Sequence, residues 1–254
     1  MDEPFERVPA EGIAPYTRRD TEHADPAHRP TKAQYDRYLW LVEHFRSLGW
    51  DNARLHDASP FQVLDPGFNA ILIRAAADLA ELADALGETA IASESRDHAA
   101  RGLAALDTLW SERHGQYLCR DRRTGALIES ASSGGLLPAF AAIPARRAAA
   151  LARRIEALAG AVRFAVPSHE PADPRFDAKR YWRGPLWLVV NYMIADGLAR
   201  AGEAAAAGAI TGSSLALIRK SGFAEYYDPL AGTPLGGGRF TWTAAMVLEF
   251  LRPS

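Results

Sequence analysis

The sequence predicts an all-α fold in which helical hairpins are arranged as a toroid, with one short β-hairpin. Three observations favour this fold class. About seven segments with helical periodicity occur in pairs, long loops rich in Pro, Gly and aromatic residues separate the pairs, and strand-like segments are few. The 254 residues, 48% of them hydrophobic, are enough to bury a sizeable core.

The first predicted helices have recognisable start signals. Residues 1–31 show no periodicity, but Thr31 has the character of an N-cap for a helix over 32–48. Asp65 followed by Pro66 predicts the N-cap and first residue of the next helix, which Gly87 ends. The apolar residues of this second helix recur at helical spacing and form one stripe: Phe68, Leu72, Ala75, Leu79, Leu82 and Leu86.

The rest of the chain continues the pattern. We expect a helix over 91–110 with Leu103, Leu106 and Trp110 facing inward, and then a short hairpin within 115–128 that turns at Gly125. Further helices are predicted over 145–159, 185–201, 203–221 and 241–251.

Composition excludes several kinds of partner. The formal net charge is 29 − 31 = −2, so no strong field points to nucleic acid or to an anionic membrane. No apolar run approaches the ~20 residues of a membrane span. The single cysteine, Cys119, cannot form an internal disulfide and indicates a reducing compartment; we expect a soluble cytoplasmic protein. His23 and His28 lack a third ligand at suitable spacing, so no metal site is expected.

Three loops are dense in aromatic, glycine and charged residues, and they span 15–30, 180–187 and 222–242. Aromatic rings pack on the C–H faces of a pyranose, while Asp, Glu, Arg and Tyr bind its hydroxyl groups. Cleavage of a glycosidic bond needs two carboxyl groups. Glu225, which lies between Phe223 and Tyr226, is therefore the candidate catalytic residue.

These residues also have structural interpretations. Tyr181, Trp182 and Trp187 could anchor a loop between helices, and Glu225 could be a salt-bridge partner at a helix end. Asp65 is better explained as an N-cap than as a catalyst. The Gly236-Gly237-Gly238 run is no phosphate loop, because no strand precedes it and no Lys-Ser/Thr follows it.

Two long segments resemble a known family. The run from Tyr181 to Tyr192 is similar to the "YWRGPxWxxxNY" segment of the glycoside hydrolases related to processing α-glucosidase and trehalase. The run from Gly222 to Ala245 resembles their "GFxEYYDPxxGxxxGxxxFSWTAA" segment. Segments 15–20, 29–38 and 61–70 resemble bacterial mannosylglycerate and glucosylglycerate hydrolases, so the resemblance covers nearly the whole chain.

The resemblance implies an (α/α)6 toroid and hydrolysis of a small glycosyl-glycerate, or a related α-glucoside, with inversion and without a cofactor. It assigns the base to Glu225 and implies a platform for the sugar and a site for the glycerate. The residues implied in substrate binding are Tyr181, Trp182 and Trp187 for the sugar, Arg29 and Tyr35 for the glycerate, and Tyr16.

One departure from the family pattern is large. The family's general acid is an aspartate in a segment of the type "HPWESGxDNSPxW", and no such segment occurs here. We therefore expect 1–254 to be the C-terminal portion of a single toroid domain, lacking about half of its helices and the matched acid. Neither Asp20 nor Asp65 is a good substitute. Such a chain would expose apolar helix faces and could self-associate.

Two other functions follow from different interpretations. One is a sugar-binding or vestigial protein that has the platform but no turnover. The other is a toroid lyase or epimerase, in which Tyr or His would act as acid and base; a site centred on Glu225 argues against it.

Overall fold

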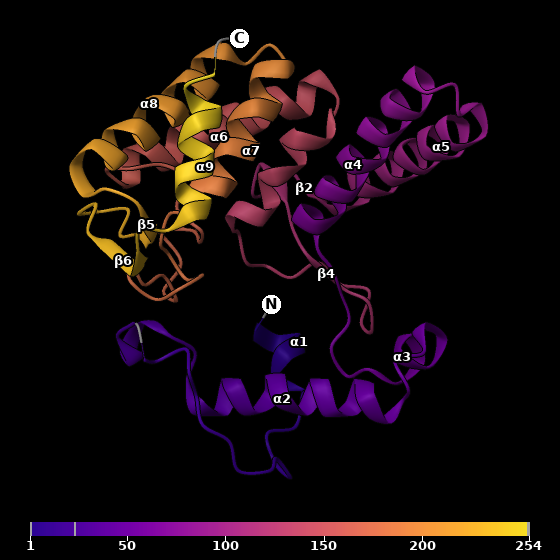
Figure 1. The fold of residues 1–254 in the computed structure, drawn as a ribbon, viewed down its shortest axis with the longest axis vertical. Coiled ribbons are helices and arrows are strands. Elements are labelled where there is room, and N and C mark those ends of the chain that lie inside the picture. Colours follow the sequence, from indigo (N-terminus) through magenta and orange to yellow (C-terminus); the bar gives the residue numbers. More distant parts are fainter. Residues whose placement is uncertain (1, 23, 253–254) are drawn as a thin grey trace.

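The computed structural model describes residues 2–22 and 24–252, and these residues form a mostly helical protein with three two-stranded antiparallel sheets (Figure 1). The helices are α1 (Asp2–Glu6), α2 (Lys32–Ser47), α3 (Asn52–Ala58), α4 (Pro66–Ala85), α5 (Thr89–Leu106), α6 (Ala145–Ala161), α7 (Leu188–Arg200), α8 (Ala204–Ser221) and α9 (Thr241–Phe250). The paired strands are β1 (Val63–Leu64) with β4 (Arg120–Asp121), β2 (Trp110–Ser111) with β3 (Gln116–Tyr117), and β5 (Ala224–Tyr227) with β6 (Pro234–Gly238).

Both predicted N-caps are confirmed. The Thr31 hydroxyl accepts the backbone N–H of Gln34 at 3.2 Å, and the Gln34 side chain accepts the Thr31 N–H at 2.9 Å, which completes a capping box. Asp65 Oδ1 accepts the N–H of Phe68 at 2.7 Å, with Pro66 in the first helical position. Asp65 is thus the cap of α4.

The segment predicted as a helix over 91–110 is corrected at its end. α5 ends at Leu106, a 3₁₀ turn covers 107–109, and Trp110 belongs to β2. Trp110 pairs with Tyr117 across the strands, and their rings make an edge-to-face contact at 5.0 Å. This contact favours a strand at Trp110 rather than a further turn of α5. The predicted turn at Gly125 is confirmed: this glycine has φ +76°, and the backbone N–H of Asp121 donates to the Ala126 carbonyl at 3.0 Å.

Two short helices, the β1–β4 pairing and the hairpins β2–β3 and β5–β6 went unpredicted. α1 lies within the segment that showed no periodicity, and α3 follows Asp51, whose carboxylate accepts the N–H of Arg54 at 2.8 Å. The hairpin β5–β6 lies in the third loop, so the segment around Glu225 is a strand. α7 starts at 188, not 185, because Leu186 is paired with Tyr227 of β5 in an extended conformation.

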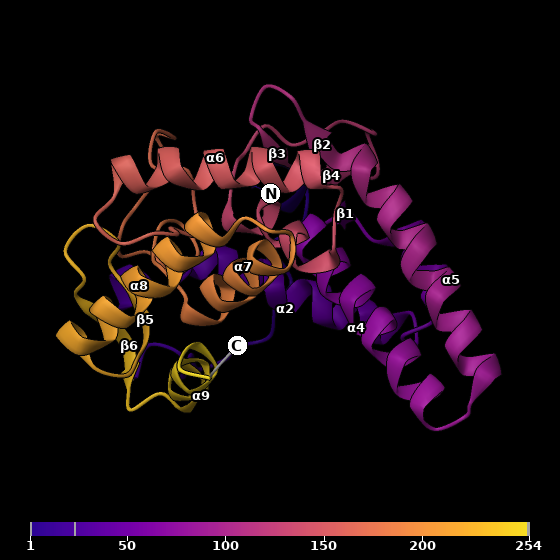
Figure 2. The same cartoon turned by 90° about the horizontal axis from the view of Figure 1, so that it is seen from above.

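Pairs of antiparallel helices form the body of the molecule. α4 packs on α5 and α7 packs on α8, as the predicted hairpins require (Figures 1 and 2). Leu151 of α6 and Ile194 and Leu198 of α7 are completely buried in the main core. Seen from above, the α4–α5 hairpin extends away from the layer formed by α6, α7 and α8 (Figure 2).

The expected exposure of apolar helix faces is confirmed. The large side chains of the α4 stripe are solvent-accessible, and in α2 the buried residue is a polar one, Asp36. Within residues 2–22 and 24–252, none of the helices combines the length and the apolar character that crossing a membrane demands.

Candidate active site

Glu225 lies at an irregularity in the β5–β6 hairpin. Ala224 pairs with Gly238 and Tyr226 pairs with Leu235, and the register shifts between these two pairs, at the position of Glu225. The extra residue lies in β6, where Gly236 and Gly237 together oppose Glu225, so the bulge brings the Gly237 N–H within reach of the carboxylate. The sequence therefore places the carboxylate by backbone geometry as well as by side-chain packing.

Three groups hold the Glu225 carboxylate. Arg29 Nη2 donates to Oε2 at 3.2 Å, the backbone N–H of Gly237 donates to the same oxygen at 3.2 Å, and the Tyr181 hydroxyl donates to Oε1 at 3.4 Å. The side chains of Glu225 and Arg29 are only 12% and 11% exposed. A nearly enclosed carboxylate with both oxygens bound has a fixed orientation, which a catalytic group needs.

Gly236 makes room for this carboxylate. It has φ +69°, and a Cβ at this position would overlap Glu225 Oε2 and lie 2.7 Å from Tyr226 Cε1. Glycine is thus required here both by conformation and by the close approach of two side chains. Gly238, in contrast, has nothing within 4 Å of such a Cβ.

An aromatic platform lies next to Glu225. We use this name for Tyr181, Trp182, Trp187 and Tyr226. The ring of Trp187 is stacked between Trp182, at 4.1 Å and 8°, and Tyr226, at 4.9 Å and 24°. Tyr181 meets the edges of Trp187 and Tyr226 at 5.1 and 5.5 Å. Trp182 is 45% exposed whereas Trp187 is 3% exposed, so Trp182 is the indole with a face open to a ligand.

Tyr181 is held in an unusual backbone conformation, with φ +32°. The Trp187 indole N–H donates to the Tyr181 carbonyl at 3.3 Å, which fixes the turn from the other side. Burial, and to a smaller extent the charge of Glu225, raise the pKa of Tyr181, so its hydroxyl stays a hydrogen-bond donor at neutral pH. A residue with positive φ persists where its surroundings fix it, and such residues gather at functional sites.

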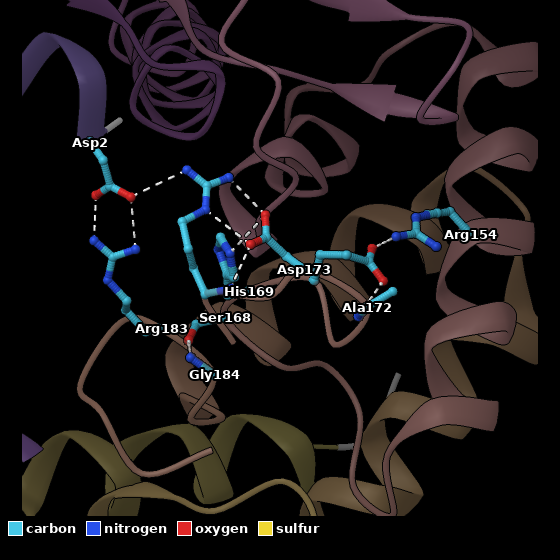
Figure 3. Close-up of polar contacts among 10 residues, drawn as sticks. Asp2, Arg154, Ser168, His169, Ala172, Asp173, Arg183 and Gly184 are labelled. Atoms are coloured by element: carbon cyan, nitrogen blue, oxygen red, sulfur yellow. Dashed lines mark hydrogen bonds and ion pairs between the residues drawn. The ribbon is translucent and has the colours of Figure 1, made fainter. Parts of the chain in front are cut away.

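The loop that carries Tyr181 and Trp182 is tied down by ionic contacts (Figure 3). Arg183 binds the Asp2 carboxylate of α1 with both terminal nitrogens, one of them at 2.8 Å. Ser168 accepts the N–H of Gly184 at 3.1 Å, and Asp173 lies 3.4 Å from the His169 ring. Burial lowers the pKa of His169 despite this neighbour, so the imidazole is mainly neutral at pH 7.

The first loop supplies Arg29 and a second aromatic group. Tyr16 and Tyr35 stack at 5.6 Å, and the Tyr16 hydroxyl donates to Asp36 at 2.6 Å. Burial and this hydrogen bond raise the pKa of Tyr16 to about 12. Arg18 covers the other ring, 4.6 Å from the centroid of Tyr35, and donates to the Pro30 carbonyl beside Arg29 at 2.7 Å.

The structure thus places the predicted site residues in two groups. Tyr181, Trp182, Trp187 and Arg29 lie around Glu225, and the guanidinium of Arg29 is 4.6 Å from the Tyr181 ring centroid. Tyr16 and Tyr35 form the second group, joined to the first through Arg18 and Pro30.

Sequence reasoning did not single out Tyr226. Its ring is completely buried, its hydroxyl has no hydrogen-bond partner among the described residues, and burial raises its pKa to about 12. The signal that could have found it was its place directly after Glu225 in an aromatic run.

A cavity of about 660 Å³ lies between α1, α2 and the loop over 174–183. Its wall includes Arg37, Arg180 and Arg183, with Asp2 and Glu6, but Glu225 is not part of it. Arg180 and Arg183, which flank Tyr181 and Trp182 in the sequence, connect this wall to the loop of the platform.

The described residues contain no cluster of three or more His, Cys, Asp or Glu that could hold a metal ion. His28 lies 3.9 Å from Asp25, and His23 lies outside the described residues. Among the hydrogen bonds and ion pairs of the described chain, no second carboxylate touches Glu225. Asp20 is bound by Arg18 at 2.5 and 3.0 Å, and this hydrogen bonding lowers its pKa.

Comparison with known proteins gives consistent matches. Residues 1–243 match the model of the mannosylglycerate hydrolase MGH1-like glycoside hydrolase domain. The chain is 45% identical over 251 residues to a mannosylglycerate hydrolase of Selaginella moellendorffii, covering 98% of this chain and 51% of the relative. It is 44% identical over 252 residues to the mannosylglycerate hydrolase of Thermus thermophilus, covering 99% of this chain and 60% of the relative.

Solved structures agree with these matches. The crystal structure of a Thermus thermophilus mannosylglycerate hydrolase with Tris and D-glycerate superposes with a TM-score of 0.95 at 44% identity, over 99% of this chain and 60% of that one. A neutral trehalase of Saccharomyces cerevisiae, at a TM-score of 0.53 and 14% identity, shares the fold alone. The predicted toroid class is confirmed, and the chain spans between half and two thirds of the length of these curated relatives.

Proposed function

The chain belongs to the mannosylglycerate hydrolase MGH1-like glycoside hydrolase family, and we propose that it acts in the hydrolysis of a small glycosyl-glycerate. Relatives at 44–45% identity are named mannosylglycerate hydrolases, and one of them was crystallised with D-glycerate. The observation that carries the proposal is the Glu225 carboxylate, fixed by Arg29 and Tyr181 at the edge of the aromatic platform.

In this proposal Glu225 is the general base of an inverting hydrolase. It takes a proton from the water that attacks the anomeric carbon, on the face opposite the leaving oxygen. Tyr181 binds one oxygen while Arg29 and the Gly237 N–H bind the other. These contacts leave the carboxylate one preferred direction in which to accept the proton.

The sugar packs on Trp182. Its exposed indole face suits the C–H face of a pyranose, and Trp187 supports it from behind. Arg29 is assigned to the carboxylate of glycerate, because a guanidinium can bind a carboxylate through two parallel hydrogen bonds. Tyr35 and Tyr16 are assigned to the glycerate side as well.

The second carboxyl group is proposed to come from outside the described part of this chain. A general acid has to be protonated at the working pH, which requires a raised pKa. Asp20 has its pKa lowered by Arg18, Asp36 is bound by Tyr16 and Lys32, and Asp65 caps α4. None of the three suits the role.

We further propose that residues 1–254 form the C-terminal portion of a single toroid domain, which works in a reducing compartment such as the cytoplasm. The presence of a single cysteine, Cys119, supports the compartment.

A second candidate is a sugar-binding protein without turnover. It is favoured by the same absence of a second carboxylate in contact with Glu225 among the described residues. The platform and Arg29 would then bind the glycoside, and Glu225 would only accept hydrogen bonds.

The test compares the wild-type chain with Glu225→Gln, each co-expressed with the portion of a mannosylglycerate hydrolase relative that this chain does not match, which supplies the general acid. Calorimetric titration with mannosylglycerate measures binding, and an enzymatic assay measures released glycerate. A hydrolase releases glycerate, and the substitution abolishes release while binding persists. If both proteins bind equally and neither releases glycerate, the binding-only function holds.

A further inference from the structure

One short turn presents two residues of the candidate site at once. The Tyr181 hydroxyl donates to Glu225 at 3.4 Å, and Trp182 offers a 45% exposed indole to a ligand. The turn is closed by the N–H of Arg183, which donates to the Arg180 carbonyl at 2.7 Å, and we call these four residues the platform turn. Because Tyr181 has φ +32°, which a residue with a side chain seldom adopts, contacts outside the platform turn have to hold it.

Asp2 of α1 holds the last residue of the platform turn. Both terminal nitrogens of Arg183 donate to the Asp2 carboxylate, one of them at 2.8 Å (Figure 3). The side chains of Arg183 and Asp2 are 24% and 29% exposed, so solvent screens the pair only in part. A guanidinium bound through two parallel hydrogen bonds has a fixed plane. Since the Arg183 carbonyl also accepts the N–H of Asp177 at 2.8 Å, the side chain and the backbone of Arg183 are both fixed.

A second arginine connects Asp2 to an earlier part of the same loop. Arg175 Nη1 donates to Asp2 at 3.3 Å, while Arg175 Nε and Nη2 bind Asp173 at 2.9 and 2.7 Å. Burial opposes ionisation, but hydrogen bonding and the charge of Arg183 lower the pKa of Asp2, so its carboxylate is charged at neutral pH. One carboxylate of α1 thus links two arginines of the loop.

The base of the loop is held without Asp2. Ser168 Oγ accepts the N–H of Gly184 at 3.1 Å, and the Ser168 N–H donates to the Gly184 carbonyl at 3.2 Å. A Cβ at Gly184 would overlap the Asp177 carbonyl oxygen, so the chain is closely packed there. Loss of the Asp2 contact should therefore loosen the platform turn without unfolding the loop.

Asp2 is distinguished from the other acidic residues of α1 by these contacts. Among the side-chain hydrogen bonds and ion pairs of the described residues, none involves Glu3 or Glu6, and none joins Asp2 to Glu225. Both oxygens of the Asp2 carboxylate are bound by arginines. Any influence of Asp2 on the candidate site therefore passes through the platform turn.

We propose that Asp2 is a positioning residue of the candidate site. Through Arg183 it keeps the platform turn in the conformation that presents Trp182 to the sugar and Tyr181 to Glu225, and Arg175 adds a second contact to the same carboxylate. The identity of the ligand rests on the proposed function, whereas the effect of Asp2 on the platform turn does not.

Fluorine NMR of the chain labelled with fluorotryptophan tests this role, because it observes the indole of Trp182 itself. The Trp182 resonance is identified by its absence from Trp182→Phe. Asp2→Asn keeps the shape of the side chain and removes its charge, and we expect it to shift the Trp182 resonance by more than the line width. The resonance of Trp110, which pairs with Tyr117 in β2, should not move. Glu3→Gln is the matched control in the same helix and should leave the Trp182 resonance unchanged.

Calorimetric titration with mannosylglycerate gives a second readout. Asp2→Asn should weaken binding about fivefold, while Asp2→Glu, which retains the carboxylate, should recover most of the affinity and the wild-type resonance. Arg183→Gln breaks the same ion pair from the side of the loop and should reproduce both effects of Asp2→Asn. Circular dichroism checks that each variant is folded, and Arg183→Gln carries the test if Asp2→Asn does not fold.

An unshifted Trp182 resonance in the folded variants overturns the proposal whatever their affinity, because the platform turn would then not depend on Asp2. An equal shift in Glu3→Gln overturns it as well. A shifted resonance in a chain that binds no mannosylglycerate supports the role of Asp2 and contradicts the proposed ligand, so the two failures can be told apart.

Discussion

The guanidinium of Arg29 and the carboxylate of Glu225, which are 196 positions apart in the chain, form an ion pair of 3.2 Å in which both side chains are nearly enclosed. The guanidinium also lies over the ring of Tyr181, at 4.6 Å. This pair connects the first loop to the β5–β6 hairpin, so the candidate site is assembled from the two ends of the described chain.

Arg29→Ala should destabilise the protein and weaken glycerate binding. Removing one partner of an enclosed ion pair leaves the other charge without compensation, which costs roughly 3 kcal/mol. Urea unfolding measures the change for Arg29→Ala, Glu225→Gln and the double variant. We expect the two effects to be non-additive by about 1 kcal/mol or more. Strict additivity would mean that the two side chains do not interact.

Trp182→Ala should mainly weaken sugar binding, whereas Trp187→Ala should mainly destabilise the fold. Trp182 is exposed on the platform, so its removal should lower the affinity for mannosylglycerate about tenfold and change stability little. Trp187 is buried between two rings, so its removal should reduce the free energy of unfolding by about 3–5 kcal/mol. Calorimetric titration and urea unfolding separate the two effects. If Trp187→Ala stayed folded and only this variant lost binding, the indole that contacts the sugar would be Trp187 and not Trp182.

Gly236→Ala should displace the Glu225 carboxylate. The new methyl group would collide with Oε2, and the positive φ disfavours any side chain. We expect a stability loss of about 1–2 kcal/mol, together with loss of any turnover that depends on Glu225. Gly238→Ala is the control, since its Cβ meets nothing within 4 Å. If Gly236→Ala and Gly238→Ala lowered the unfolding temperature equally, a collision between the new methyl group and the Glu225 carboxylate would be contradicted.

Acid should weaken the contact between the N-terminal segment and β4. Hydrogen bonding by Arg7 lowers the pKa of Asp121 to about 2, although burial acts in the opposite direction. An aspartate in an unfolded chain titrates near 4, so the ion pair stabilises the fold fully above about pH 4 and loses this effect as the pH falls towards 2. Urea unfolding from pH 7 to pH 3 should show a shallower decline for Asp121→Asn than for the wild type. Asp57→Asn, at an exposed carboxylate, should leave the decline unchanged.

Local signals in the sequence predicted much of the helical framework. The side chains of Thr31 and Asp65 each accept the backbone N–H three residues further along the chain. Because this contact is local, such caps can be recognised from the sequence without knowledge of tertiary contacts. The stripe on α4 followed from spacing alone. Spacing does not say what covers a face, and the stripe turned out to be exposed.

The β5–β6 hairpin could not be predicted in the same way. β6 is Pro234-Leu-Gly-Gly-Gly238, a composition that ordinarily disfavours strands, and it is paired because β5 lies beside it. Tyr227 fixes β5 by donating to the Gly222 carbonyl at 2.6 Å and by pairing with Leu186. The family resemblance indicated Arg29 and Glu225 separately, and only the folded chain brings them into contact.

Fluoride release from α-mannosyl fluoride tests the central claim, that Glu225 acts as a general base, most directly. Fluoride leaves without needing a proton, so the reaction does not depend on a general acid and reports on activation of water alone. We expect the wild-type chain to accelerate release and Glu225→Gln to lower the rate by about 100-fold or more while mannosylglycerate still binds. Equal rates of release for the two proteins would contradict that claim.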